Sequence, residues 1–210
     1  WSEWIDVKKY APLSTYHSKD NWELQKKLIS EAKQKGLKGR SYRRYVSGPA
    51  YEGSSAASER NYHDGAMTDL AIKALKEADD QPFFMVVGYK KPHLPFVAPQ
   101  KYWDLYDPDE IELPDNYYLS KDAPPIAQMT WGELRAYSGI PAKGPVDSLT
   151  ARKLIHGYYA CVSFVDALIG RLLEALKEQG LDDNTIVVLW GDHGWKLGEH
   201  AMWCKHTNYE

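Results

Sequence analysis

An acidic side chain and an imidazole stand next to each other between two glycines, in the segment Gly191-Asp192-His193-Gly194. The segment follows an apolar, β-branched run at 185–190, which predicts a buried parallel strand. In open α/β sheets, ligands bind beyond the carboxyl ends of such strands. Asp192 offers a hard oxygen ligand to a divalent cation and His193 offers a neutral imidazole. Two ligands are too few for a metal site, and an isolated pair of this kind is more often turn chemistry.

A second charged loop follows another apolar run of strand length, at 83–87, and contains Lys91 and the proline-flanked His93. If the two runs are parallel neighbours in a sheet, His93 and the metal-binding pair emerge at the same edge. His93 would there bind an anion or pass a proton to a leaving alcohol. Lys205, later in the chain, supplies a point charge suited to a sulfate or phosphate oxygen. The convergence of these residues predicts a site, whereas each of them alone is more often a turn or surface residue.

Helices alternate with these apolar runs along the chain. Hydrophobic spacing predicts helices at 21–35, at 64–78 with Asp64 as the cap, and at 147–179. Each of the last two helices leads directly into one of the two apolar runs. The alternation predicts an α/β fold, a three-layer sandwich around a mainly parallel sheet.

Other stretches are predicted to be irregular or to face solvent. The Gly/Ser/Ala-rich stretch 48–60 predicts a loop, and the proline-rich stretch 107–146 predicts an excursion of the kind that borders a site. The basic run at 38–45 either contacts an anionic polymer or, as the neutral overall charge favours, forms a solvated face. Cys161 lies on the apolar face of its predicted helix. Cys204 is interpreted as a half-buried thiol, because no base is identifiable beside it.

Composition excludes several classes of function. The 210 residues carry a net charge of −3 and a sequence pI of about 6.2, so nothing global indicates binding to nucleic acid or to an anionic membrane. The 2 cysteines make neither a disulfide framework nor a paired zinc motif, and no apolar run reaches membrane-spanning length. The chain begins at Trp1 and stops at Glu210, directly after its most charged loop. We therefore expect residues 1–210 to be one partial domain, truncated at both ends, from a longer protein.

Three segments together resemble the sulfatases, a family of the alkaline-phosphatase-like superfamily. The segment GDHGWKLGEHAMWCKHTNYE (191–210) is similar to the family's late active-site motif. The segment PFFMVVGYKKPHLPFVAP (82–99) resembles the Lys-Pro-His loop of the iduronate-2-sulfatase-like branch, and HGYYACVSFVDALIGRLLEAL (156–176) matches the same branch. The resemblance covers most of residues 62–210. It implies an alkaline-phosphatase-like fold, an N-terminal-type catalytic domain, and hydrolysis of the sulfuric ester of a sulfated sugar or related alcohol.

By this resemblance Asp192 and His193 would bind Ca²⁺, His93 and Lys205 would hold the sulfate and assist departure of the alcohol, and Lys91 matches a substrate-binding position. The family nucleophile is a formylglycine made in a Cys/Ser-x-Pro/Ala-x-Arg motif, whose aldehyde hydrate attacks sulfur. No such motif is present in the 210 residues, and the family's early Asp pair and Lys-x-x-His element are absent too. We expect all of these upstream of this sequence, and we expect the 210 residues alone to be inactive.

Two alternative functions stay open. A phosphohydrolase of the same superfamily uses related Asp and His ligands, and a Ser or Thr nucleophile in place of formylglycine would indicate it. A non-catalytic protein that binds anions or carbohydrates on the same fold would lack the early Asp pair in its complete sequence. The resemblance implies a sulfated carbohydrate or small sulfate ester as substrate, polysaccharide or glycosaminoglycan degradation, and a periplasmic, secreted or lysosomal location. It leaves the individual substrate and the oligomeric state open.

Overall fold

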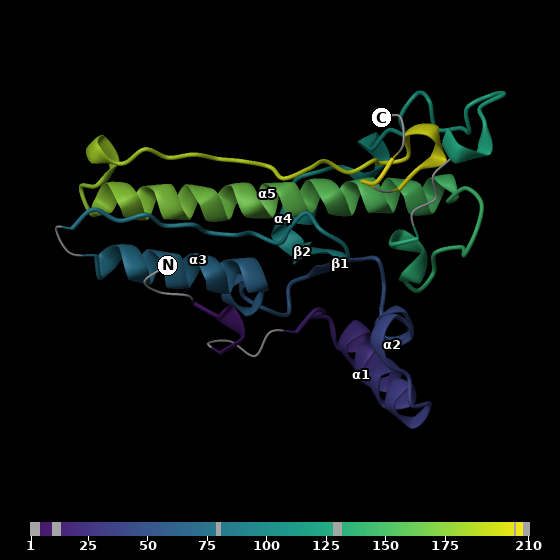
Figure 1. Cartoon of the computed structure of the whole chain (residues 1–210), viewed down its shortest axis with the longest axis horizontal. Coiled ribbons are helices and arrows are strands. Elements are labelled where there is room, and N and C mark those ends of the chain that lie inside the picture. The colour runs from purple at the N-terminus through teal and green to yellow at the C-terminus, as the bar shows by residue number, and fades with distance from the viewer. Residues whose placement is uncertain (1–4, 10–13, 79–80, 128–131, 204, 208–210) are drawn as a thin grey trace.

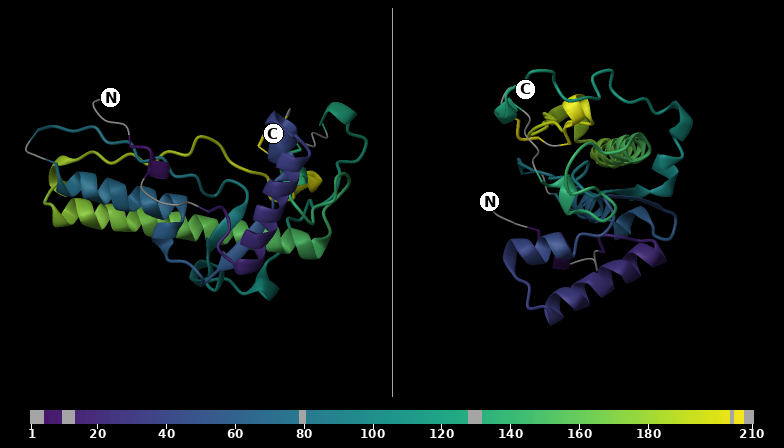
Figure 2. Two further views of the ribbon diagram at one scale, coloured as in Figure 1. Left: turned by 90° about the horizontal axis from the view of Figure 1, so that it is seen from below. Right: turned by 90° about the vertical axis from the view of Figure 1, so that its right-hand side faces the viewer.

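A 31-residue helix, α5 (Ser148–Glu178), is the axis of the molecule (Figure 1). The computed structural model describes residues 5–9, 14–78, 81–127, 132–203 and 205–207. Helix α3 (His63–Lys76) packs along α5, whereas α1 (Lys19–Gln34) and α2 (Gly39–Tyr45) project away from this helix pair (Figure 2). The remaining described elements are β1 (Tyr51–Ser54), β2 (Phe96–Pro99), α4 (Gln100–Trp103) and single 3-10 turns at Val7–Lys9, Glu59–Asn61, Pro108–Glu110, Pro125–Ala127, Leu134–Ala136, Asp182–Asn184 and Glu199–Ala201.

The helices predicted from hydrophobic spacing are confirmed, including the signals that end the longest one. The Asp147 carboxylate accepts a hydrogen bond of 2.9 Å from the backbone N–H of Thr150 and so caps the start of α5. Gly180 follows the end of α5 with a φ of +64°, a conformation that favours glycine. The predicted cap of α3 is wrong. Tyr62 occupies that position, and the buried Asp64 lies inside the first turn because its carboxylate binds elsewhere.

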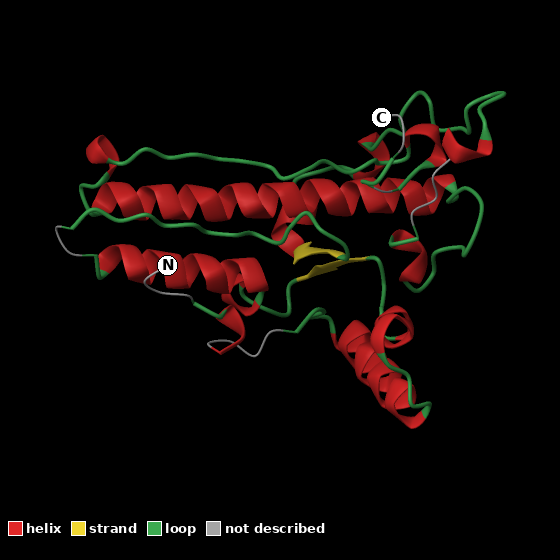
Figure 3. Cartoon of the chain, viewed as in Figure 1, coloured by secondary structure: helices red, strands yellow, loops and turns green. Residues whose placement is uncertain are grey.

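Two short strands form a parallel sheet between the helices (Figure 3). Strand β1 pairs with β2 in the register that joins Tyr51 to Phe96 and Ser54 to Pro99. Neither strand is predicted from the sequence, in which residues 48–60 were expected to form a loop. Each strand has 4 residues, and glycine or proline occupies part of each, so local propensity is weak. Their pairing joins distant segments and depends on burial beneath α5.

The two apolar runs predicted to be buried strands are extended, but they are neither buried nor paired. Both run along the α3–α5 helix pair (Figures 1 and 2), and no strand is assigned to them within the described residues. In 83–87 the exposure of the side chains differs between neighbours. Met85 packs against α3 and α5, whereas Phe84 is 80% exposed. In 185–190 the residues from Ile186 to Trp190 are all exposed, with Ile186 at 92%. The apolar pattern indicates a strand, but within the described chain nothing lies beside either run to complete a sheet.

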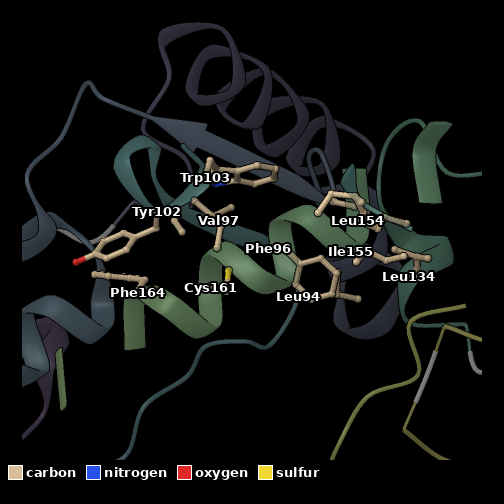
Figure 4. Close-up of a cluster of buried hydrophobic side chains, with 14 of the residues drawn as sticks. Leu94, Phe96, Val97, Tyr102, Trp103, Leu134, Leu154, Ile155, Cys161 and Phe164 are labelled. Carbon is tan, nitrogen blue, oxygen red and sulfur yellow. The ribbon is translucent and has the colours of Figure 1, made fainter. Parts of the chain in front are cut away.

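The main hydrophobic core forms where β2 and α4 pack against the middle of α5 (Figure 4). Phe96, Trp103 and Phe164 contribute large aromatic side chains, and Cys161 is fully buried among them, which confirms its predicted place in the core. Burial raises the pKa of the Cys161 thiol to about 12, so the thiol is protonated at neutral pH. Close approach of the elements requires Gly157, because a Cβ there would lie 2.7 Å from the Trp103 ring.

The stretches predicted to be irregular or solvent-facing behave largely as predicted. The described residues of the stretch 107–146 form 3-10 turns and one isolated parallel bridge, from Ser138 to Pro49, and the stretch is held to the core by Leu134 and Val146. The basic run lies mostly on α2, which has no buried residue, as the solvated interpretation favours. None of the helices in the described part of the chain has the length and apolarity to cross a membrane.

Candidate functional site

A buried aspartate anchors the loop that carries His93. The two carboxylate oxygens of Asp64 accept hydrogen bonds of 2.9 Å and 2.8 Å from the backbone N–H groups of Lys90 and Lys91. The His63 ring bonds the same carboxylate at 3.0 Å. Burial alone would raise the pKa of Asp64, but these hydrogen bonds outweigh it and hold the pKa below its usual value. Helix α3 thereby fixes the backbone two residues before His93.

The Lys91 ammonium group closes the same loop from its other side. It donates hydrogen bonds of 3.1 Å to the His93 carbonyl oxygen and 2.5 Å to that of Pro95. Burial lowers the pKa of the Lys91 amine, an effect that the nearby Cys161 and Asp64 partly oppose. Lys91 thus holds the shape of the loop, and its predicted contact with substrate stays a prediction.

His93 and Lys205 meet at one carboxylate, that of Glu133. The Nε2 atom of His93 lies 3.0 Å from one Glu133 oxygen, and the Nζ atom of Lys205 lies 3.4 Å from the other. These residues are 112 positions apart in the sequence and lie on separate loops, one before β2 and one after the turn at 199–201. The structure therefore brings together the two residues that were predicted to bind an anion.

Asp192 and His193 lie on a more open segment. The Asp192 side chain is 85% exposed, and its two oxygens lie 3.0 Å from the His193 backbone N–H and 3.4 Å from the His193 Nε2 atom. Two residues further on, Trp195 packs edge-on to Phe96 of β2 and lies beneath the Lys205 ammonium, whose Nζ atom is 5.7 Å from the ring centroid. The Asp192 loop is thus tied to the neighbourhood of Lys205 and β2.

The donors among the described residues do not complete a calcium site. Ca²⁺ takes about six to eight oxygen ligands, whereas this segment offers one carboxylate and one imidazole. Within the described ranges no group of three or more His, Cys, Asp or Glu side chains gathers where a metal ion would fit. Asp192 and His193 suit two positions of a larger ligand set, and we derive no chemical step through a metal. Cys204, predicted to be a half-buried thiol, lies outside the described residues.

Sequence reasoning missed Glu133 and misjudged Asp64. Glu133 lies in the irregular stretch 107–146, which was predicted to border a site, but no motif distinguishes it from the other acidic residues there. Asp64 carried a local signal, an acidic residue at a helix start, and its nonlocal contacts to Lys90 and Lys91 overrode that signal. Both residues act through contacts between distant segments, which spacing along the chain does not reveal.

Comparison with known proteins gives a consistent set of similarities. Residues 10–210 match the family model described as "Sulfatase". The chain is 36% identical over 155 residues to iduronate 2-sulfatase from Mus musculus, covering 70% of this chain and 28% of that protein. It is 40% identical over 162 residues to a sulfatase from Formosa agariphila, covering 75% of this chain and 31% of that protein. The chain thus spans less than a third of the length of either relative.

A solved structure shares the fold. The phosphonate monoester hydrolase SpPMH from Silicibacter pomeroyi superposes with a TM-score of 0.62 at 25% sequence identity, over 86% of this chain and 38% of that one. The predicted fold class is confirmed: the chain is an α/β protein with a parallel sheet that matches the alkaline-phosphatase-like fold of this neighbour.

Proposed function

Because the chain belongs to the sulfatase family, we propose that the complete protein containing it hydrolyses sulfate esters. The observation that carries the proposal is the meeting of His93 and Lys205 at one carboxylate. An imidazole and an ammonium group that converge on an internal anion have the charge and the donors to hold a sulfate group. The substrate class that we propose is a sulfated sugar or a related alcohol, in keeping with the iduronate 2-sulfatase that the chain resembles.

Each residue has a separate task in the proposed reaction. Lys205 binds a sulfate oxygen and neutralises part of the charge that develops as the S–O bond breaks. His93 donates a proton to the oxygen of the leaving alcohol, which receives the electrons of that bond. Asp192 and His193 would hold a Ca²⁺ ion together with ligands from outside the described residues, and the ion would supply further charge stabilisation. The nucleophile, a formylglycine in the proposal, would also come from outside the 210 residues.

A turnover screen of the complete protein tests the reaction class. We expect hydrolysis of 4-nitrophenyl sulfate at least about tenfold faster than that of 4-nitrophenyl phosphate, because the proposal assigns the site to sulfate. The structural similarity to a phosphonate monoester hydrolase makes phosphoester hydrolysis the second candidate. Faster turnover of the phosphate ester would select that candidate, and turnover of neither ester would refute both.

The metal role of Asp192 has its own test. Asp192→Ala in the complete protein should remove bound calcium and lower kcat by at least about 100-fold, because a hard cation loses a carboxylate ligand. Calcium content is measured on the purified protein by elemental analysis. The control is Asp183→Ala, an exposed carboxylate in the 3-10 turn before the same segment. Near-normal calcium content and turnover in Asp192→Ala would contradict the assignment.

A further inference from the structure

The carboxylate of Glu133 has both oxygens engaged by predicted anion-binding residues. One oxygen bonds His93 Nε2 at 3.0 Å and the other lies 3.4 Å from Lys205 Nζ. The side chains of Glu133 and Lys205 are 20% and 14% exposed, whereas that of His93 is 42% exposed, so the contact is shielded from water mainly on its Lys205 side. Partial burial makes such a contact stronger than a surface ion pair, which solvent screens.

The two nitrogens of the His93 ring each face an acceptor oxygen. Its Nδ1 atom lies 2.7 Å from the Leu94 carbonyl oxygen, while Nε2 faces Glu133. A carbonyl oxygen and a carboxylate both accept, so each ring nitrogen faces a hydrogen-bond acceptor. The imidazolium form, with two N–H groups, would satisfy both acceptors, and it is the form that a proton donor to a leaving group needs.

The backbone on both sides of this contact is anchored to one core. Leu94, directly after His93, and Leu134, directly after Glu133, are 2% and 1% exposed and belong to the same buried cluster (Figure 4). The next residue, Arg135, donates hydrogen bonds to the carbonyl oxygens of Pro141 and Gly144. The Glu133 carboxylate is thus presented by a fixed turn, which keeps it beside His93 in the resting site.

We propose that Glu133 is a positioning residue that holds the His93 imidazolium and the Lys205 ammonium beside each other in the sulfate-binding site. The proposal rests on the proposed function for its catalytic meaning. Glu133 does not touch the reacting atoms. It fixes the orientation of two donors until the proton passes to the leaving oxygen. Before the transfer, the Nε2–H group turns its hydrogen bond from Glu133 to the leaving oxygen. The proton then passes to that oxygen as the S–O bond breaks, and Nε2 is left with a lone pair.

The test is Glu133→Gln in the complete protein, which keeps the size of the side chain and removes its charge. We expect kcat/KM to fall roughly 10- to 100-fold because a proton donor loses its orientation and its charged partner. The alkaline limb of the pH profile should move to lower pH, because an imidazolium at this position would lose a neighbouring negative charge. The loss should be larger for an alkyl sulfate than for 4-nitrophenyl sulfate, whose leaving group needs little protonation.

Two comparison variants separate this role from a structural one. Glu133→Asp keeps the charge and should keep the alkaline limb near its wild-type position, even where the shorter side chain lowers kcat. Glu112→Gln removes an exposed charge in the same irregular stretch and should leave the pH profile unchanged. Equal pH profiles for wild type and Glu133→Gln would overturn the proposal. So would a lower KM at unchanged kcat, since Glu133 would then compete with the substrate.

A second measurement keeps the two proposals distinguishable. NMR with histidine labelled at Cε1 follows the titration of His93 in the complete protein, with its signal assigned by the loss of one peak in His93→Gln. We expect the midpoint of this titration to be lower in Glu133→Gln than in wild type. If wild type hydrolyses no sulfate ester, the proposed function fails, while a lowered midpoint still supports the Glu133 contact. An unchanged midpoint overturns that contact whatever the activity.

Discussion

At the scale of single residues, Asp64 links the helical body to the candidate site. Its carboxylate is buried, yet it stays charged because two backbone N–H groups and the His63 ring bond it. These bonds fix the chain just before His93. A buried carboxylate with this many donors stabilises the fold only in its ionised form.

Replacing Asp64 tests this linkage. Asp64→Ala should lower the free energy of unfolding by about 2–4 kcal/mol at pH 7, since two backbone N–H groups in partly buried hydrogen bonds lose their acceptor. The pKa of Asp64 is lowered in the fold, so its contribution is complete above the ordinary aspartate pKa of about 4 and is lost as the pH falls through the folded value. Urea unfolding between pH 7 and pH 3 should therefore show the gap between wild type and Asp64→Ala narrowing with acid. Asp166→Ala, at an exposed position of α5, is the control. A gap that widens on acidification would contradict the assignment.

The parts of the site that could be predicted from the sequence are residues whose side chains can bind an anion or transfer a proton. His93 and Lys205 were predicted from their types and from the loops that carry them, and they do lie at one carboxylate. Glu133 could not be predicted, because a carboxylate among many gains its role only from the fold that places it. The roles of Asp192, His193 and Lys91 as metal and substrate ligands stay predictions.

At the scale of elements, α5 determines how closely the sheet can approach. Gly157 lies where Trp103 and Phe96 press against the helix, and an added Cβ would lie 2.7 Å from one and 3.0 Å from the other. Gly170, on the same helix, has nothing within 4 Å of a built Cβ. The two glycines thus differ only in their packing.

This pair gives a matched test of the contact. Gly157→Ala should destabilise the chain by about 1–3 kcal/mol, because overpacking displaces Trp103 and exceeds the gain in helix propensity. Gly170→Ala should stabilise it by up to about 1 kcal/mol, because alanine favours the helix and meets no obstacle. Thermal and urea unfolding measure both. Equal stabilisation by the two substitutions would show that α5 does not approach the sheet this closely.

Secondary-structure elements could be predicted where the apolar pattern in the sequence is local and extends over many residues. The helices at 19–34, 63–76 and 148–178 repeat their apolar residues over several turns, and all were predicted within a few positions. Strands β1 and β2 have 4 residues each and are defined by each other, so no local window indicates them. The runs at 83–87 and 185–190 have the apolar pattern of strands, but within the described residues no neighbouring strand pairs with them.

At the scale of the whole molecule, those two runs are the main unfavourable feature of the surface. Phe84, Ile186, Val188 and Trp190 are each at least 79% exposed. Patches of this kind on a soluble chain mark surfaces that are normally covered, and extended apolar segments are templates for pairing with another chain.

We therefore expect the 210-residue chain, produced alone, to self-associate with rising concentration. The double substitution Ile186→Lys/Val188→Lys should shift it toward monomer, because charge on an extended edge opposes pairing. Light scattering coupled to gel filtration measures the mass. Leu149→Lys removes a single exposed leucine at the start of α5 and should change little. Identical association by wild type and the double variant would exclude the 185–190 run as the cause.

The same uncovered runs have a consequence inside a cell. Chaperones and proteases of the quality-control system act on chains that expose extended apolar segments, since such segments distinguish an incompletely folded protein from a folded one. Polypeptide that stops after these 210 residues would display two such segments however well its helices are formed. Degradation would then limit the lifetime of such a polypeptide, whatever its chemistry.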